Sequence, residues 1–164
     1  ANEALAACVN TARQRKYEGI GEYIDLGYVP SDKNSTSVSN TLEYAYDDWC
    51  IAQLAKYLGK NDIFEEFHKR SENWKNVYDS RLGFMRPKLS DGNFRQNFDV
   101  LETHGQGFIE GNAWNYSLYV PHNPEGLMKT MGGEARFSRY LDSLFTMHFL
   151  MSFLPIPKIL PGKG

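Results

Sequence analysis

Residues 42–58 constrain the fold most, because as a helix they would place apolar side chains on nearly every side. A helix that is apolar all round is buried inside a larger structure. Polar residues at 37–41 offer several N-caps before it, and Gly59 is suited to end it. The apolar members are Leu42, Tyr44, Ala45, Tyr46, Trp49, Ile51, Ala52, Leu54, Ala55 and Leu58.

The other long periodic segments have one apolar stripe and one charged face. Residues 62–78 and 134–148 both follow this pattern, which predicts two amphipathic helices on the outside of the fold. Gly132 and Gly133 form a joint before the second of them.

Shorter segments connect these helices. Residues 4–15 have the pattern of the end of a helix, residues 23–30 that of a short extended or loop segment, and residues 31–34 that of a polar turn. Residues 80–107 form a long loop with several glycines. A loop of this length in a compact domain is usually functional or contains a small hairpin.

Residues 108–119 predict a second inner helix, which Pro121 and Pro124 interrupt, and a short helix over residues 124–131 follows. This alternation of inner and outer helices resembles an α/α toroid, in which buried helices form a ring inside amphipathic ones. The predicted fold is all-α: a partial α/α toroid, a fragment of an (α/α)6 barrel, whose long rim loops build the site. A partial ring leaves apolar faces uncovered, which predicts self-association.

Composition excludes several classes of function. The 164 residues carry a net charge of −2 with Lys and Arg scattered, so no basic footprint for nucleic acid is present. No apolar run is long enough to span a bilayer. Residues 1–15 lack the layout of a signal peptide, as expected of a cytoplasmic protein or of an internal piece of a longer one. Cys8 and Cys50 lack metal-ligand spacing, and we interpret them as small buried hydrophobes rather than a disulfide or a ligand pair.

Glu110 lies in a glycine- and aromatic-rich stretch, residues 108–127, at the predicted start of the second inner helix. Aromatic faces with a few amides and one acid suit a sugar better than a phosphate or a peptide. A carboxyl group held against apolar rings tends to stay protonated, which a general acid requires. Asn112 and Trp114 would then be sugar-facing or structural neighbours. The alternative is a helix N-terminal carboxylate, which the helix dipole favours.

Glu43 and Asp47 lie four residues apart on one face of the first inner helix, next to Asp48. Like charges on a mostly buried helix are unfavourable unless they face a wet cleft, a cation or a hydrogen-bond network. This favours a role in lining the site, and the alternative is hydrogen bonding to neighbouring loops. His122 is suited equally to anchoring its loop or to contacting a substrate. The sequence contains no His-x-x-x-His pair, so it gives no indication of a zinc site.

Several motifs follow one another in a fixed order over residues 27–148. They are Gly27-Tyr28-Val29-Pro30, Ser37-Val38-Ser39, Asp48-Trp49, Gly83-Phe84-Met85-Arg86, Glu110-Gly111-Asn112-Ala113-Trp114, Val120-Pro121-His122, Glu125-Gly126-Leu127 and Met131-Gly132-Gly133. In this order they resemble part of the catalytic domain of glycoside hydrolase family 92, the calcium-dependent exo-acting α-mannosidases.

The resemblance implies an α/α-barrel catalytic domain behind a β-rich N-terminal domain, in a secreted or periplasmic parent. It also implies calcium-dependent removal of terminal α-linked mannose from glycans, with inversion. An inverting glycosidase needs an acid on one face of the sugar and a base with a water on the other. By resemblance Glu110 takes the acid position. The residues predicted to bind substrate are Glu43, Asp47, Asn112, Trp114 and His122.

The departures from the family pattern are large. Missing are the N-terminal β domain, the downstream Gly-Asp-Asp type segment that supplies the base, and the later Gly-Asn-Glu-Pro-Ser-His stretch. Most calcium ligands are expected outside this chain as well. We therefore expect residues 1–148 to carry the acid without completing the reaction alone. The rival interpretation is a non-catalytic helical remnant that binds carbohydrate or is purely structural.

Residues 149–164 form an atypical tail. Family members continue here in a pattern like Leu-Pro-Asp-Glu-Phe-Phe, whereas this chain is apolar and rich in proline. One choice of codons for the tail, with a single C added in front, reads Leu-Pro-Asp-Glu-Phe-Phe-Ala-His in the neighbouring frame. The hypothesis is a frameshift by loss of one base, and the alternative is a natural end of the chain. Sequencing the gene beyond codon 148 distinguishes them.

Overall fold

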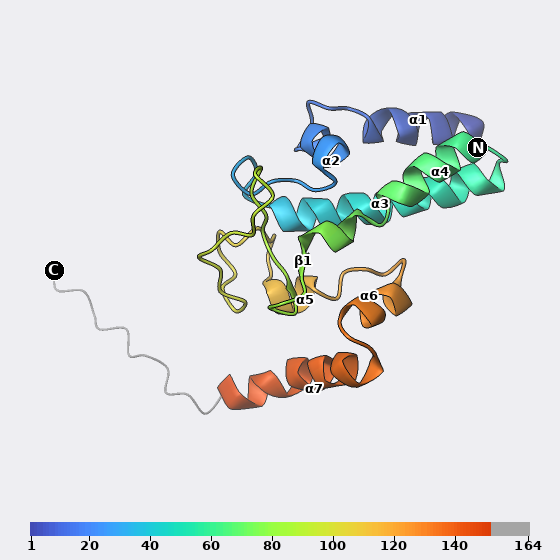
Figure 1. Ribbon diagram of the computed structural model, residues 1–164. Helices are drawn as coiled ribbons and strands as arrows, with labels where there is room; N and C mark the ends of the chain where they lie inside the picture. Colours follow the sequence, from blue (N-terminus) through green and yellow to red (C-terminus); the bar gives the residue numbers. More distant parts are fainter. Residues whose placement is uncertain (152–164) are drawn as a thin grey trace. The chain divides into compact units, whose positions relative to one another are not determined.

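The structure is a computed structural model that describes residues 1–151, and these residues are mainly helical (Figure 1). The chain divides into two compact units, residues 1–127 and 128–164. The prediction of a helical architecture is confirmed. The predicted tail lies largely outside the described residues.

Three helices form the core of the first unit: α1 (Asn2–Ala12), α3 (Ser37–Tyr57) and α4 (Asn61–Arg70). They run side by side in Figure 1 and share one cluster of buried apolar side chains. Its members on α1 are four residues apart, those on α3 span one helical turn, and α4 contributes one residue, so each helix turns one side to the cluster. The members are Leu5, Val9, Ile51, Ala52, Ala55 and Phe67.

The α3 helix begins five residues earlier than its apolar pattern predicts. Its first backbone amides are satisfied by a distant loop: Val38 N and Ser39 N donate to the Gly107 carbonyl at 2.9 and 3.1 Å. The residue before the helix, Thr36, makes no side-chain cap bond. The prediction of an N-cap among residues 37–41 is therefore wrong, and these residues are buried inside the first turns.

The expected burial of α3 on all sides holds only for residues 37–42. Beyond them one face packs on α1 and α4, while Glu43, Asp47 and Cys50 are exposed. The prediction of buried cysteines is wrong, because Cys8 and Cys50 are both free and exposed. Both line an open, mostly apolar groove of about 440 Å³ between α1 and α3.

Two segments differ from the predicted elements for local reasons. Residues 23–26, predicted to be extended or loop, belong to α2 (Ile20–Leu26), which lies between Gly19 and Gly27, both left-handed at φ 82° and 78°. Seven residues are too few to show helical periodicity. The predicted helix over 62–78 ends at Arg70 and continues as the 3-10 helix η1 (Asn73–Val77).

The end of α4 coincides with a polar side chain that competes with the helix. Ser71 Oγ donates to the His68 carbonyl at 2.7 Å, which offers the backbone an alternative to continued helix. The change to η1 turns Trp74 fully into the core. The small hairpin expected as one possibility in the long loop is present: β1 (Tyr78–Asp79) pairs antiparallel with β2 (Phe84–Met85).

The predicted inner helix over 108–119 is reduced to the single turn α5 (Ala113–Tyr116). Residues before it follow loop conformations fixed to α3 rather than a helical ladder. The predicted short helix is present as α6 (Pro124–Thr130). In the second unit, Gly132 and Gly133 both have positive φ, and α7 (Glu134–Met151) follows as predicted.

Candidate active site

Glu110 lies in the loop before α5, not at the start of a helix. Its side chain is exposed, and its backbone is left-handed with φ 52°. Only one other non-glycine residue in the described part of the chain, Glu18, has positive φ. The expected enclosure by aromatic rings is therefore absent in the described residues, because the surrounding rings pack on the loop backbone rather than around the carboxyl.

Asn112 is the N-cap of α5. Its Oδ1 accepts from Trp114 N at 3.0 Å, its backbone N donates to Asn115 Oδ1 at 3.2 Å, and its Nδ2 donates to the Leu101 carbonyl at 3.2 Å. Both ends of the Asn112 amide are thus engaged by the protein itself, which supports the structural role left open from the sequence.

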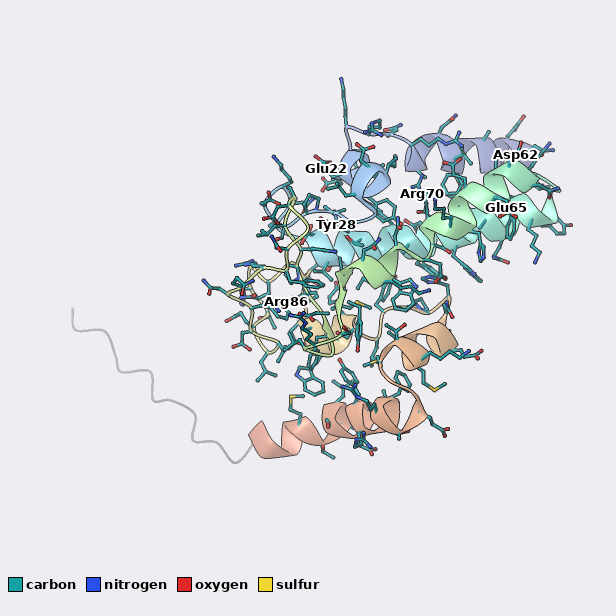
Figure 2. All side chains as sticks on the ribbon, viewed as in Figure 1. Glu22, Tyr28, Asp62, Glu65, Arg70 and Arg86 are labelled. Atoms are coloured by element: carbon teal, nitrogen blue, oxygen red, sulfur yellow. The ribbon has the colours of Figure 1, made fainter. Side chains whose placement is uncertain are left out.

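Trp114 is half-buried and packs edge-to-face on Phe84 of β2, with ring centroids 4.9 Å apart. The hairpin that carries Phe84 is held in turn by Arg86, whose guanidinium donates to Asp79 Oδ2 at 2.8 Å (Figure 2). Arg86 Nε also donates to the Arg95 carbonyl at 3.0 Å. These contacts fix the strand on which the Trp114 ring rests.

Glu43 and Asp47 both lie on the open face of α3. Partial burial raises the pKa of both carboxyls, and the charge of Asp47 adds to the rise at Glu43. Burial raises the pKa of the Tyr119 hydroxyl as well, and both carboxylates add to that rise. The structure therefore brings Glu43 and Asp47 close to the segment that follows α5, although Tyr119 lies far from them in sequence.

Four rings lie beside these carboxylates, and we call Tyr46, Trp49, Tyr119 and His122 the aromatic cluster. Tyr46 stacks on Trp49 with centroids 6.1 Å apart and meets Tyr119 edge-on at 6.4 Å. The His122 ring lies 6.1 Å from Tyr46 and 6.3 Å from Trp49. Half of this cluster comes from α3 and half from the segment after α5, so only the fold assembles it.

His122 anchors its loop. Its Nε2 donates to the Ser71 carbonyl at 2.9 Å, at the point where α4 ends. Burial lowers the pKa of the ring, so His122 is neutral with the proton on Nε2. Its Nδ1 is buried without a hydrogen-bond partner among the described residues. Of the two roles left open for His122, the anchoring role is present in the structure.

Asp48 is the buried acid that the sequence pattern did not separate from Asp47. Its Oδ2 accepts from Arg70 Nε at 2.9 Å and from the Tyr23 hydroxyl at 2.8 Å. Burial raises the pKa of Asp48 to about 7, although Arg70 and Tyr23 act to lower it. Arg70, which lies among α1, α3 and α4 in Figure 2, also donates to the Ala12 carbonyl at 3.1 Å. Neighbouring positions on a helix point about 100° apart, which explains why Asp47 is exposed and Asp48 is not.

Comparison with known proteins explains why these motifs occur together. The profile of the glycosyl hydrolase family 92 catalytic domain matches residues 1–153. The chain belongs to glycosyl hydrolase family 92. The resemblance drawn from the sequence motifs is therefore confirmed.

Solved family 92 structures share the fold. The GH92 α-mannosidase BT3965 of Bacteroides thetaiotaomicron has a TM-score of 0.84 and 39% identity, over 88% of this chain and 19% of its own. Its complex with mannoimidazole has a TM-score of 0.85 and 36% identity, over 98% of this chain and 21% of its own. The GH92 inverting mannosidase BT2199 of the same organism has a TM-score of 0.82 and 39% identity, over 87% of this chain and 20% of its own. These matches confirm the partial α/α toroid.

A relative named as an uncharacterised secreted glycosidase, from Arthroderma benhamiae, is 26% identical over 80% of this chain and 21% of its own length. The chain thus spans about a fifth of the length of these relatives. No helix within residues 1–151 is both long and apolar enough to cross a membrane.

The family resemblance implies calcium, an ion that is held by carboxylate, amide and carbonyl oxygens. Calcium takes roughly six to eight oxygen ligands. Among the described residues, no three His, Cys, Asp or Glu side chains group closely enough to hold a metal ion. The described carboxylates therefore do not supply a calcium ligand set by themselves.

Proposed function

We propose that this chain is the acid-bearing part of an α-mannosidase that removes terminal mannose from glycans with inversion. The observation that carries the proposal is the match to two mannosidases at 39% identity, one of them described as inverting. Within that frame Glu110 is the general acid. Its exposure supports this role, since a general acid must reach the leaving oxygen.

In the proposed reaction, the Glu110 carboxyl donates its proton to the glycosidic oxygen as the bond from that oxygen to the anomeric carbon breaks. A water attacks the opposite face of the sugar after a second carboxylate removes its proton. Inverting enzymes hold the two carboxyls roughly 6.5–9.5 Å apart to leave room for this water. We propose that the second carboxylate lies in a part of the parent outside this chain.

The proposed substrate surface combines the aromatic cluster with the two exposed carboxylates Glu43 and Asp47. Ring faces suit the C–H faces of a sugar, and carboxylates accept hydrogen bonds from its hydroxyls. Trp114 and Asn112 would contribute beside Glu110. For Asn112 this contribution is indirect, because its side chain is already used to cap α5.

Further properties of the parent are part of the same proposal: calcium dependence, with ligands from other segments, and secretion or a periplasmic location.

For the isolated chain we propose self-association through exposed apolar side chains. Tyr57 and Phe145 are the most exposed of these, at 84% and 80%. Sedimentation velocity over a range of concentrations measures it, and a strictly monomeric chain would contradict it.

Hydrolysis of α-mannosides by the purified chain tests the proposal. The account predicts binding of mannose-based probes without turnover, because the acid is present and the base is not. Turnover at an enzyme-like rate would contradict the proposal that the acid lies in this chain and the base outside it. The second candidate function is a non-catalytic carbohydrate-binding piece, which the half-buried aromatic cluster beside two exposed carboxylates favours. Titrating mannose with and without calcium, in wild type and D47N, measures that binding separately from catalysis.

A further inference from the structure

Ile109, the residue that precedes Glu110, has both of its backbone polar atoms held by side-chain hydrogen bonds. We infer that Ser39 and Tyr116 are positioning residues that fix the backbone of Glu110. The catalytic meaning of this inference rests on the proposed function of Glu110. The hydrogen bonds do not depend on that proposed function, so the positioning contacts and the acid role of Glu110 can be tested separately.

Ser39 connects the Glu110 loop to the first turn of α3. Its side chain is fully buried, and its Oγ accepts from Ile109 N at 3.0 Å. Its own backbone N donates to the Gly107 carbonyl at 3.1 Å. The helix therefore binds the loop at two points only two residues apart, and it holds them in register with the start of α3.

Tyr116 holds the loop from the other side. Its hydroxyl donates to the Ile109 carbonyl at 2.7 Å, and its ring stacks on Phe108 with centroids 5.3 Å apart. A Cβ added at Gly111 would lie 3.0 Å from the same ring. Tyr116 thus contacts the residues on both sides of Glu110, and Gly111 is small because the ring passes so close.

These contacts explain the unusual backbone of Glu110. Left-handed φ is unfavourable for a residue with a Cβ and persists only where the surroundings determine it. Here both polar atoms of the Ile109 backbone are bonded, one to Ser39 and one to Tyr116. The chain direction at Glu110 is therefore set by α3 and α5 together. A general acid gains from such fixing because proton transfer depends on the distance to the leaving oxygen.

Amide hydrogen exchange on the full 164-residue chain, followed by NMR, tests the inference without any need for activity. In S39A the Ile109 amide loses its acceptor and should exchange about tenfold faster than in wild type, as expected for loss of one hydrogen bond. In Y116F the same amide should also exchange faster, because the loop loses the hydrogen bond at the Ile109 carbonyl. The carboxyl ¹³C resonance of Glu110 should shift in both variants. Y119F is the matched control: it removes a tyrosine hydroxyl three residues away, and both readouts should stay at their wild-type values.

The inference is overturned if exchange at the Ile109 amide is unchanged, or if exchange rises by the same factor in α1 and α4, which would indicate general loss of stability. Y116F removes one oxygen from a half-buried ring and so decides the test even where S39A fails to fold. Faster exchange at Ile109, together with full activity of E110Q in a mannosidase that contains this segment, would leave the positioning contacts standing and reject the proposed acid.

Discussion

At the scale of single residues, the left-handed backbone of Glu110 makes a prediction about stability that is independent of catalysis. Alanine normally stabilises a loop relative to glycine, by about 0.4–1 kcal/mol through the unfolded state. At φ 52° the order should reverse, because only glycine adopts this region without cost. We predict that E110G is more stable than E110A by about 1 kcal/mol in urea denaturation. The usual order, with E110A the more stable, would contradict the backbone seen at Glu110.

His122 makes a prediction about pH. Its pKa is lowered in the folded chain, so below its ordinary pKa the unfolded state binds more protons and stability falls as pH falls. Asp48 has the opposite sign: its raised pKa means that stability falls as pH rises from about 4 to 7. The test is therefore the difference between wild type and H122Q in thermal midpoint. That difference should shrink from about pH 7 to pH 5, and a constant difference would contradict the buried neutral ring.

The sequence identified Glu110 from its neighbours, but not its exposure or its left-handed backbone. Both depend on Ser39, which lies some seventy residues earlier and approaches only in the fold. The spacing placed Asp47 on one face with Glu43, but the burial of Asp48 was not predicted, since it depends on where α1 and α4 pack. The roles of Asn112 and His122 were correctly left open, and the hydrogen bonds of the structure show the structural part of each.

At the scale of elements, the pair of Arg70 and Asp48 connects the ends of α1 and α4 to the middle of α2 and α3. The pair is almost fully buried, with side chains 13% and 1% exposed, and Tyr23 and Ala12 complete its hydrogen bonds. Removing Arg70 leaves the buried Asp48 carboxyl without its cation, so that it must either take up a proton or stay charged and unpaired. At pH 8 R70M should therefore lower the free energy of unfolding by about 3–5 kcal/mol. Urea denaturation followed by far-UV circular dichroism measures it.

Arg15 provides the matched control for this prediction. It also pairs with an aspartate, Asp25, but both side chains are more than half exposed. Such pairs contribute little, so R15M should leave the urea midpoint unchanged. Equal losses in R70M and R15M would show that the buried network does not hold these helices together.

Elements with long, regular patterns were predicted well, and those set by local backbone chemistry were not. The spacing of apolar residues over 134–148 correctly predicted α7, and Gly132 and Gly133 correctly predicted the joint before it. The α2 helix was missed because seven residues carry no period, although Gly19 and Gly27 mark its ends. The predicted helix at 108–119 failed because its apolar residues serve the loop that carries Glu110 rather than a helical stripe.

At the scale of the whole molecule, the pattern of α3 and its structure disagree in an informative way. Its sequence predicts burial on all sides, yet Glu43, Asp47 and Cys50 are exposed. The chain spans about a fifth of the length of its solved relatives, and we expect this face to be covered in a chain of their full length. The apolar pattern of α3 thus suits a helix that is covered on all sides, whereas residues 1–151 cover only part of it.

The central claim, that Glu110 is the general acid of an α-mannosidase, is tested most directly in a chimera. Residues 1–148 would replace the matching segment of BT3965, which shares the fold at a TM-score of 0.84. Folding is checked by circular dichroism, and E65Q on the exposed face of α4 serves as the matched control.

The measurement is kcat/KM of the E110Q chimera on two substrates, α-mannobiose and 2,4-dinitrophenyl α-mannoside. A sugar leaving group needs the acid, whereas dinitrophenolate leaves without protonation. The account predicts that E110Q loses about 10³-fold on the disaccharide but less than about tenfold on the aryl mannoside, with E65Q unchanged on both. Equal losses on the two substrates, or no loss on either, would contradict it.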